Sequence, residues 1–511
     1  MPNNTITVIL PGIVLAGAAL LVFLVDMFVR RKEILAWVAA GGLVAAAAVA
    51  VGQWLRIDGA SLADFISGRG SSLFGGREAE SGFGAMVALD KYALFCTLLF
   101  CVVGVLTIML ADAYMKKRRE AMGEFYGLLL LVIVGMYGMA VSVDVIAFFV
   151  AFELMSLPTY VLAGFLRGDA RSGEASVKYF VNGAFASAIL LFGLALLYAA
   201  TGQTNYASIA ASLGDLAPDA ASGLTVVAMV LIVVGFGFKV SAVPFHSWAP
   251  DVYEGAPTPV TAFMSVGVKA GAFVGFLKLF TVAAAETADI WTAALIVLAV
   301  LTMVVGNLLA LPQRNLKRML AYSSVAHAGY LLLGLIAVGR SGDSTGSSAV
   351  LFYLGAYAFM NIGAFGILVW IRDRRRFSYT LDEMAGLGRT MPWAAIAMTL
   401  FMVSLTGIPP TVGFWGKFYL FTAVVDAGLT WLAIVAVIMS SVSAYYYLRV
   451  VWYMYFREAP EGAVVEADEA GPALGAGAAV ALAALGVLLL GLYPSPLISA
   501  AQGALRVILG G

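Results

Sequence analysis

The feature that most constrains this chain is a long series of apolar runs separated by short polar segments. A helix needs about 20 apolar residues to cross the hydrocarbon core of a bilayer, so each run predicts a membrane span. Of the 511 residues, 62% are hydrophobic and 12% are charged, whereas soluble domains carry about 25% charged residues. The composition therefore excludes an ordinary water-soluble enzyme.

We expect about fourteen spans from these runs. The runs are continuous and much longer than the segments of about ten alternating residues that build a transmembrane barrel, so we predict an all-α polytopic membrane protein. The first run lacks the basic flank and the small-residue cleavage site of a signal peptide, so we expect it to be retained as a membrane span. The predicted spans lie at about residues 8–28, 35–54, 86–110, 124–142, 144–166, 177–200, 224–248, 257–281, 291–311, 316–338, 349–371, 391–423, 428–454 and 473–495.

The positive charges of the loops predict the orientation in the membrane. Loops after odd-numbered spans hold about nineteen Lys and Arg residues, and the opposite side holds about five. Since Lys and Arg are retained on the cytoplasmic side, both termini should face away from the cytoplasm. We expect residues 55–85 to form an exposed loop, and the acidic stretch from Glu458 to Glu469 to form a cytoplasmic one.

The remaining composition excludes two further classes of function. The 30 Lys and Arg residues balance the 30 Asp and Glu residues, so no basic surplus favours nucleic acid as a partner. Cys96, Cys101 and the two histidines do not make a ligand set for haem, an iron–sulfur cluster or zinc. We therefore expect no cofactor or metal in this chain.

Six lysines remain within or at the ends of the predicted spans. A charge at the bilayer centre costs about 2.5–3.5 kcal/mol on insertion scales, so a buried lysine indicates a hydrated path or a partner. Two of the six, Lys91 and Lys278, stand near span ends, and we expect their side chains to reach the interface. The deep ones, for which we predict a function, are Lys239, Lys269 and Lys417.

The sixth lysine, Lys178, has a candidate partner in Glu153, the carboxylate in the middle of the fifth predicted span. The fifth and sixth spans are joined by a short loop and should be antiparallel neighbours, so the two side chains could approach each other. Opposite charges attract by about 4 kcal/mol at 4 Å with an effective dielectric constant of 20. The pair could switch the protonation of Lys178, or it could be a static ion pair that fastens two helices.

Proline interrupts two predicted spans that carry deep lysines. Pro244 follows Lys239, and the sequence ahead of the last deep lysine contains Gly407, Pro409 and Pro410. Proline removes a backbone hydrogen bond, and unsatisfied backbone at membrane depth is tolerated only against protein or water. Both interrupted spans are the fourth member of a set of five, in spans 4–8 and in spans 9–13. This pattern favours two inverted five-helix repeats of the transporter kind over two unrelated kinks.

The repeats predict how the chain is divided, and the chain also contains two histidines. His246 stands at the cytoplasmic end of the seventh span and His327 in the tenth. Each imidazole could titrate near neutral pH and relay protons, or could simply pack in the core. We predict four segments: an N-terminal three-helix segment at 1–111, the repeats at 112–281 and 282–456, and an acidic loop with the final helix at 457–511.

Five stretches resemble the antiporter-like membrane subunits of complex I, the proton-pumping NADH:quinone oxidoreductase. They are FELMSLPTYVLAGF, EASVKYFVNGAFASA, GFKVSAVPFHSWAPDVYEGAPTPVTAFM, GNLLALPQRNLKRMLAYSSVAHAGYLL and GIPPTVGFWGKFY. The resemblance covers about residues 120–455. The segment between Pro244 and Val260 is its most specific part.

The resemblance implies a proton-translocating subunit in a bacterial inner membrane. It implies that NADH, FMN, iron–sulfur clusters and quinone are held by partner subunits, and that the neighbours of this chain are other membrane subunits, lipid, water and protons. The implied proton path consists of Glu153 and Lys178 as a gating ion pair, Lys239 as the central lysine, Lys269 and Lys417 as the onward path, and His246 and His327 beside it.

Two other interpretations remain open at this point. Mrp-type Na⁺/H⁺ antiporters share the same core, so the chain could belong to a cation/proton antiporter that needs neither NADH nor quinone. A membrane scaffold without transport is the second alternative, in which the buried charges only lock helices together.

Overall fold

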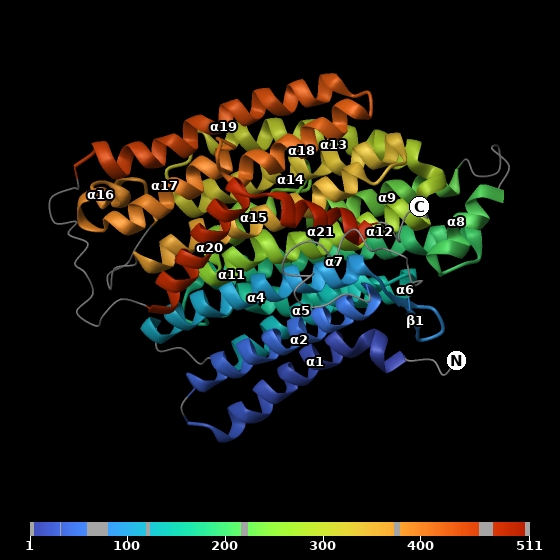
Figure 1. The fold of residues 1–511 in the computed structure, drawn as a ribbon, viewed down its shortest axis with the longest axis horizontal. Coiled ribbons are helices and arrows are strands. Elements are labelled where there is room, and N and C mark those ends of the chain that lie inside the picture. Colours follow the sequence, from blue (N-terminus) through green and yellow to red (C-terminus); the bar gives the residue numbers. More distant parts are fainter. Residues whose placement is uncertain are drawn as a thin grey trace.

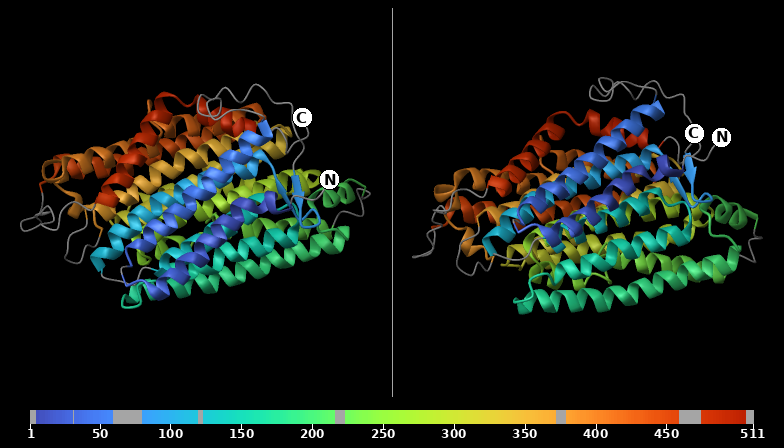
Figure 2. Two further views of the ribbon diagram at one scale, coloured as in Figure 1. Left: turned by 60° about the horizontal axis from the view of Figure 1, so that its bottom comes forward. Right: turned by 90° about the horizontal axis from the view of Figure 1, so that it is seen from below.

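A computed structural model of the chain describes residues 5–30, 32–58, 80–118, 123–215, 223–371, 379–458 and 474–505. These residues form a bundle of helices that run roughly along one direction, with β1 and α8 at one end and α16 at the other (Figure 1). The same common direction is visible after rotation of the molecule (Figure 2). The prediction of a helical polytopic fold is confirmed.

One element of the fold was not predicted, a short antiparallel hairpin just before the third long helix. It consists of β1 (Glu80–Gly82) and β2 (Val87–Leu89), with Ser81 opposite Ala88. The hairpin lies at the edge of the loop expected at 55–85, most of which is outside the described residues. The acidic stretch expected to form a second loop also lies outside them, except for Glu458.

The first half of the chain contains both long apolar helices and several shorter helices. They are α1 (Thr5–Phe28), α2 (Ile34–Asp58), α4 (Lys91–Arg118), α5 (Gly123–Val141), α6 (Val145–Ala163), α7 (Ala170–Thr201), α8 (Tyr206–Asp215), α9 (Leu224–Lys239), α10 (Trp248–Gly255), α11 (Thr258–Phe263) and α12 (Lys269–Lys278). Two π-helical segments, η2 (Met264–Val268) and η3 (Leu279–Ala283), flank α12 and continue its course.

The second half follows after the 3₁₀ turn η4 (Ala285–Thr287). Its helices are α13 (Ala288–Ala310), α14 (Leu316–Ser341), α15 (Thr345–Trp370), the 3₁₀ turn η5 (Asp382–Met384), α16 (Leu387–Thr390), α17 (Pro392–Thr406), α18 (Val412–Asp426), α19 (Thr430–Phe456), α20 (Leu474–Leu492) and α21 (Ser495–Leu505).

Twelve helices within the described residues are long and apolar enough to cross a membrane. Two shorter apolar helices, α9 and α17, lie where the seventh and twelfth spans were predicted. The predicted apolar runs therefore correspond to twelve long helices and two interrupted ones. The total of fourteen spans and the inverted repeat stay predictions.

Three elements form the centre of the bundle and are buried along nearly their whole length: the stretch from α11 to η3, α14 and α15. The backbone of α14 packs closely against the backbone of α13. A Cβ atom added to Gly306 of α13 would lie 2.7 Å from the backbone nitrogen of Ala326 on α14, so only glycine fits there. The polar side chains of α14 are thereby held inside the bundle.

Candidate functional site

Lys239 is the last residue of α9 and its side chain is buried inside the bundle. Its ammonium donates a hydrogen bond to Ser156 Oγ of α6 at 2.6 Å and lies 4.8 Å from the centre of the Phe152 ring. The carboxylate of Glu153 is close enough to act on Lys239 electrostatically. The first deep lysine thus meets neutral groups directly and one carboxylate at longer range.

The chain is interrupted directly after Lys239, and protein groups satisfy the freed backbone. Pro244 lies between α9 and α10, after a cis peptide bond. The Val243 amide donates to Thr302 Oγ1 at 2.9 Å, and Trp248 Nε1 donates to the Phe238 carbonyl at 3.1 Å. These bonds stabilise a non-helical backbone inside the bundle.

A second interruption separates α17 from α18, and it contains Gly407, Pro409 and Pro410. The Pro409–Pro410 peptide bond is cis. Gly407 ends α17 with φ of +91°, a left-handed conformation that favours glycine. Both predicted breaks therefore coincide with a gap between two helices.

Lys417 of α18 binds the carbonyl groups that this second break exposes. Its ammonium donates to the carbonyl oxygens of Leu405 and Thr406 at 2.9 Å each, and to Ser440 Oγ of α19 at 2.8 Å. The last carbonyls of a helix carry partial negative charge, so the end of α17 stabilises a cation there. The ammonium also lies 5.1 Å from the centre of the Tyr330 ring.

Lys269 begins α12 and is buried between α12 and α14. Its ammonium donates two hydrogen bonds to Ser324, one to the backbone carbonyl and one to the hydroxyl oxygen, both at 2.7 Å. Ser324 is therefore the direct contact between this lysine and the second half of the chain.

His327 lies one turn beyond Ser324 on α14 and is buried. Its Nε2 is 3.0 Å from the hydroxyl of Tyr447, and its Nδ1 contacts the hydroxyl of Tyr353. The charges of both Lys269 and Lys417 act on the imidazole. His327 thus lies on α14 between Ser324, which binds Lys269, and Tyr330, whose ring lies beside Lys417.

Hydroxyl and amide groups continue from His327 toward α13 and α19. Tyr447 also contacts the Ser323 hydroxyl. Next to it, Tyr446 donates to Asn307 Oδ1 at 3.0 Å, and Asn307 Nδ2 donates to the Tyr330 hydroxyl at 3.1 Å. The ring of Tyr330 in turn lies beside the third deep lysine.

Sequence reasoning found the charged residues of this region and missed the hydroxyl residues. A signal was present on α14, where Ser323, Ser324, His327 and Tyr330 recur at helical spacing in an otherwise apolar helix. Such spacing places polar side chains on one face. A polar stripe on a buried helix can therefore locate the partners of buried lysines.

The three deep lysines share one property, which is that they form no ion pair with any described residue. No carboxylate of the described residues lies within 4.0 Å of the ammonium of Lys239, Lys269 or Lys417. Their direct partners are serine hydroxyls and backbone carbonyls. We call these three residues the axial lysines.

The predicted ion pair between Glu153 and Lys178 is not formed in this structure. Lys178 binds Glu174 at 2.7 Å and Asp251 at 2.8 Å instead. Oε1 of Glu153 is buried and has no hydrogen-bond partner among the described residues. Lys178 lies near the start of α7, where more exposed carboxylates are within reach.

The structure does not bring His246 to the axial lysines. It lies in the loop between α9 and α10 and is half-buried. Its Nδ1 has no hydrogen-bond partner in the described part of the chain. A role of His246 in the path stays a prediction.

The expectation that Lys91 and Lys278 reach the membrane interface is wrong, because both are buried. Lys278 is 3% exposed and forms an ion pair of 2.9 Å with Asp90, which is 4% exposed. It also donates to the Ala140 carbonyl at 3.2 Å. Asp90 directly precedes α4, and its counter-charge lets the lysine stay inside the bundle.

Comparison with known proteins identifies the family. Residues 142–443 match the family model of the NADH:quinone oxidoreductase/Mrp antiporter membrane segment. The chain is 43% identical to a "NADH-quinone oxidoreductase subunit N" of Trichlorobacter lovleyi, over 98% of this chain and 97% of that protein. The "NADH-quinone oxidoreductase subunit N 2" of Roseiflexus castenholzii is 41% identical over 98% of this chain and 95% of its own.

Solved structures agree with these relatives. A chain of respiratory complex I from Thermus thermophilus superimposes with a TM-score of 0.76 at 34% identity, over 95% of this chain and 97% of that one. A chain of the Mrp complex from Dietzia superimposes with a TM-score of 0.79 over the whole of both chains, at 24% identity, which shows the fold alone. The chain therefore belongs to the family of NADH-quinone oxidoreductase N subunits.

Proposed function

We propose that this chain translocates protons across a bacterial inner membrane as a membrane subunit of NADH:quinone oxidoreductase. The observation that carries the proposal is the burial of three axial lysines with neutral partners, together with His327 on α14 between Ser324, which binds Lys269, and Tyr330, which lies beside Lys417. Relatives named subunit N of that enzyme at 41–45% identity support it.

The chemistry of the path follows from burial without a counter-charge. Low dielectric surroundings disfavour the charged form of a lysine, so an axial lysine can give up a proton and take it back at modest cost. The proton leaves one ammonium, crosses hydroxyl groups and bridging water, and binds the neutral amine or imidazole next in line. From Lys269 to Lys417 the route runs past Ser324 and His327.

The helix breaks supply access to this path from both sides of the membrane. Non-helical backbone at membrane depth is tolerated where it lines protein or a hydrated cavity. We infer two inverted five-helix repeats, with Lys239 and Lys417 at the corresponding breaks. From the positive loops we infer that the α16 end faces the cytoplasm and both termini face the periplasm.

The energy for transport comes from partner subunits. Moving one charge against 100 mV costs about 2.3 kcal/mol, and redox reactions in the partner subunits provide this energy. NADH, FMN, iron–sulfur clusters and quinone belong to the other subunits. The residues of this chain bind, hold and pass the proton, and Glu153 with Lys178 gates its entry.

The proposal is tested by donor-driven ion uptake in inside-out vesicles that contain the assembled complex. Proton uptake on addition of NADH should proceed equally in sodium-free and sodium-containing medium. Uptake that requires sodium, or that proceeds without NADH, would contradict the proposal and favour the Na⁺/H⁺ antiporter alternative. The likeness to the Mrp complex alone does not favour it, because at 24% identity only the fold is shared.

A further inference from the structure

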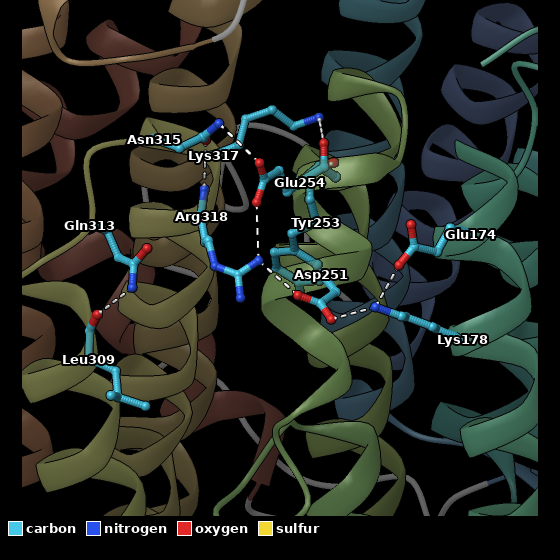
Figure 3. Close-up of polar contacts among 11 residues, drawn as sticks. Glu174, Lys178, Asp251, Tyr253, Glu254, Leu309, Gln313, Asn315, Lys317 and Arg318 are labelled. Atoms are coloured by element: carbon cyan, nitrogen blue, oxygen red, sulfur yellow. Dashed lines mark hydrogen bonds and ion pairs between the residues drawn. The ribbon is translucent and has the colours of Figure 1, made fainter. Parts of the chain in front are cut away.

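A polar cluster outside the axial lysines joins three helices of the bundle (Figure 3). The charged residues around it are Arg171, Glu174 and Lys178 of α7, Asp251 and Glu254 of α10, and Arg318 of α14. They line a cavity of about 260 Å³, which is large enough to admit water. We call this partly exposed cluster the rim of the bundle.

Asp251 is the residue that two cations of this cluster share. Lys178 donates to its Oδ2 at 2.8 Å, and Arg318 donates to its Oδ1 at 2.8 Å. Partial burial raises the pKa of the Asp251 carboxyl, but its hydrogen bonds to these two cations lower it, and the pKa lies below its ordinary value. Asp251 is therefore a fixed anion that bridges two helices.

The two helices that Asp251 joins belong to the two halves of the proposed pathway. α10 packs against both α7 and α14. α7 carries Lys178, and α14 carries Ser324 and His327 within a few turns of Arg318. A change at Asp251 therefore acts on the gating lysine and on the helix that holds the proton relay.

The ion pair between Lys178 and Asp251 is partly exposed and can therefore be broken at low cost. The two side chains are 41% and 36% exposed, and ion pairs with that much solvent access contribute little to stability. Arg318 keeps Glu254 as a second acceptor at 3.1 Å. If Lys178 leaves, Asp251 therefore keeps Arg318 as its ion-pair partner, and Arg318 keeps both carboxylates.

A second acceptor for Lys178 lies deeper in the bundle. Ser176 donates to the Tyr160 carbonyl at 2.9 Å, which sets the register of α7 against α6. At a rise of 1.5 Å per residue, Glu153 and Lys178 are then about 7–8 Å apart along the helices. Their side chains together can span that distance, and Oε1 of Glu153 has no other partner among the described residues.

We propose that Asp251 is a positioning residue that holds Lys178 at the rim, away from Glu153. Lys178 alternates between Asp251 and Glu153, and Arg318 connects that exchange to α14. This inference rests on the proposed function. The inference adds to that function a second acidic partner for Lys178 and a link between the two halves of the proposed pathway.

The test uses Asp251→Asn in the assembled complex in inside-out vesicles. Without the Asp251 anion, Lys178 should move to Glu153 and stay there. Donor-driven proton uptake should then fall by about two- to thirtyfold, the range found for residues that couple sites. Asp251→Glu should restore uptake. In the double variant Glu153→Gln/Asp251→Asn, the fold-loss of proton uptake should be smaller than the product of the two single fold-losses, because both residues serve one exchange.

Glu254→Gln is the matched control, since this carboxylate binds Arg318 and makes no bond to Lys178. The inference would be overturned if Asp251→Asn took up protons as fast as the control. It would also be overturned if the losses in the double variant were multiplicative. A cryo-EM structure of the assembled Asp251→Asn complex gives an independent readout. Lys178 should bind Glu153 there, and a lysine that stays only on Glu174 would contradict us.

The two proposals can fail separately in the same vesicles. If Lys239→Ala stops uptake while Asp251→Asn does not change it, the positioning role is wrong and the proton path stands. If Lys239→Ala pumps normally, the proton path is wrong, and the inference that depends on it falls as well.

Discussion

Lys269 and Lys278 lie at the two ends of the same helix, α12, and both are buried. Lys269 donates to the carbonyl and hydroxyl of Ser324, which carry no charge. Lys278 binds the carboxylate of Asp90 at 2.9 Å. The comparison teaches that burial alone does not make a lysine a proton carrier, because a counter-charge holds the proton in place.

The two environments are expected to produce different functions. A carboxylate in a buried pair stabilises the ammonium, and the loss of either partner leaves an uncompensated charge. Neutral hydroxyl and carbonyl partners stabilise it far less, so the amine can exchange its proton. We therefore propose transport for the axial lysines and helix attachment for the pair of Lys278 and Asp90, which joins α12 to the start of α4.

The largest effect is expected from Lys269→Met. Removing a group that transfers protons typically costs about 10²-fold or more, so donor-driven proton uptake in the assembled complex should fall at least that far. The matched control is the double variant Lys278→Met with Asp90→Leu, which removes a lysine from the other end of α12. If both variants lose transport equally, the distinction between the two lysines is wrong.

Asp90→Asn should destabilise the subunit by about 3–5 kcal/mol, because it leaves Lys278 charged and unpaired in the interior. Thermal unfolding of the purified complex, followed by native gel, measures this loss. Replacing both partners by apolar residues should recover most of the stability. An unstable double variant would show instead that the site needs the charges themselves.

A smaller effect is expected from Tyr447→Phe, which removes the hydroxyl that contacts His327 and Ser323. The loss of one hydrogen bond of about 1 kcal/mol corresponds to about fivefold slower proton uptake. Tyr445→Phe, on the exposed face of the same helix, is the control and should have no effect. Equal rates in both variants would remove Tyr447 from the relay.

The smallest effect is expected from Arg340→Gln. Its pair with Asp289 is 3.5 Å long, and the two side chains are 48% and 94% exposed. Exposed pairs contribute about 0–1 kcal/mol, so thermal stability should change little. A loss as large as that from Asp90→Asn would show that exposure does not separate the two kinds of ion pair.

Depth along the apolar runs was sufficient to predict the axial lysines, because the membrane penalises charge according to depth. Proline and glycine were sufficient to predict the two interruptions, since they break helices locally. Partners could not be predicted in the same way. Asp90 contacts Lys278 from a distant part of the sequence, and only the packed bundle brings them together.

The same limit applies to Lys178. Its nearest deep carboxylate in the sequence is Glu153, and the prediction paired the two residues on that basis. In the structure Lys178 binds Glu174 on its own helix and Asp251 on α10. A surface-accessible carboxylate costs less desolvation than a deep one, and the sequence does not say how far each side chain lies from water.

The central claim is that protons pass through the axial lysines, and Lys239 tests it most directly. Donor-driven proton uptake should be measured in inside-out vesicles for the wild type and for Lys239→Ala, with assembly of the complex verified by native gel. We expect an assembled Lys239→Ala complex to lose proton uptake together with electron transfer. Normal NADH-driven uptake in that variant would contradict the account.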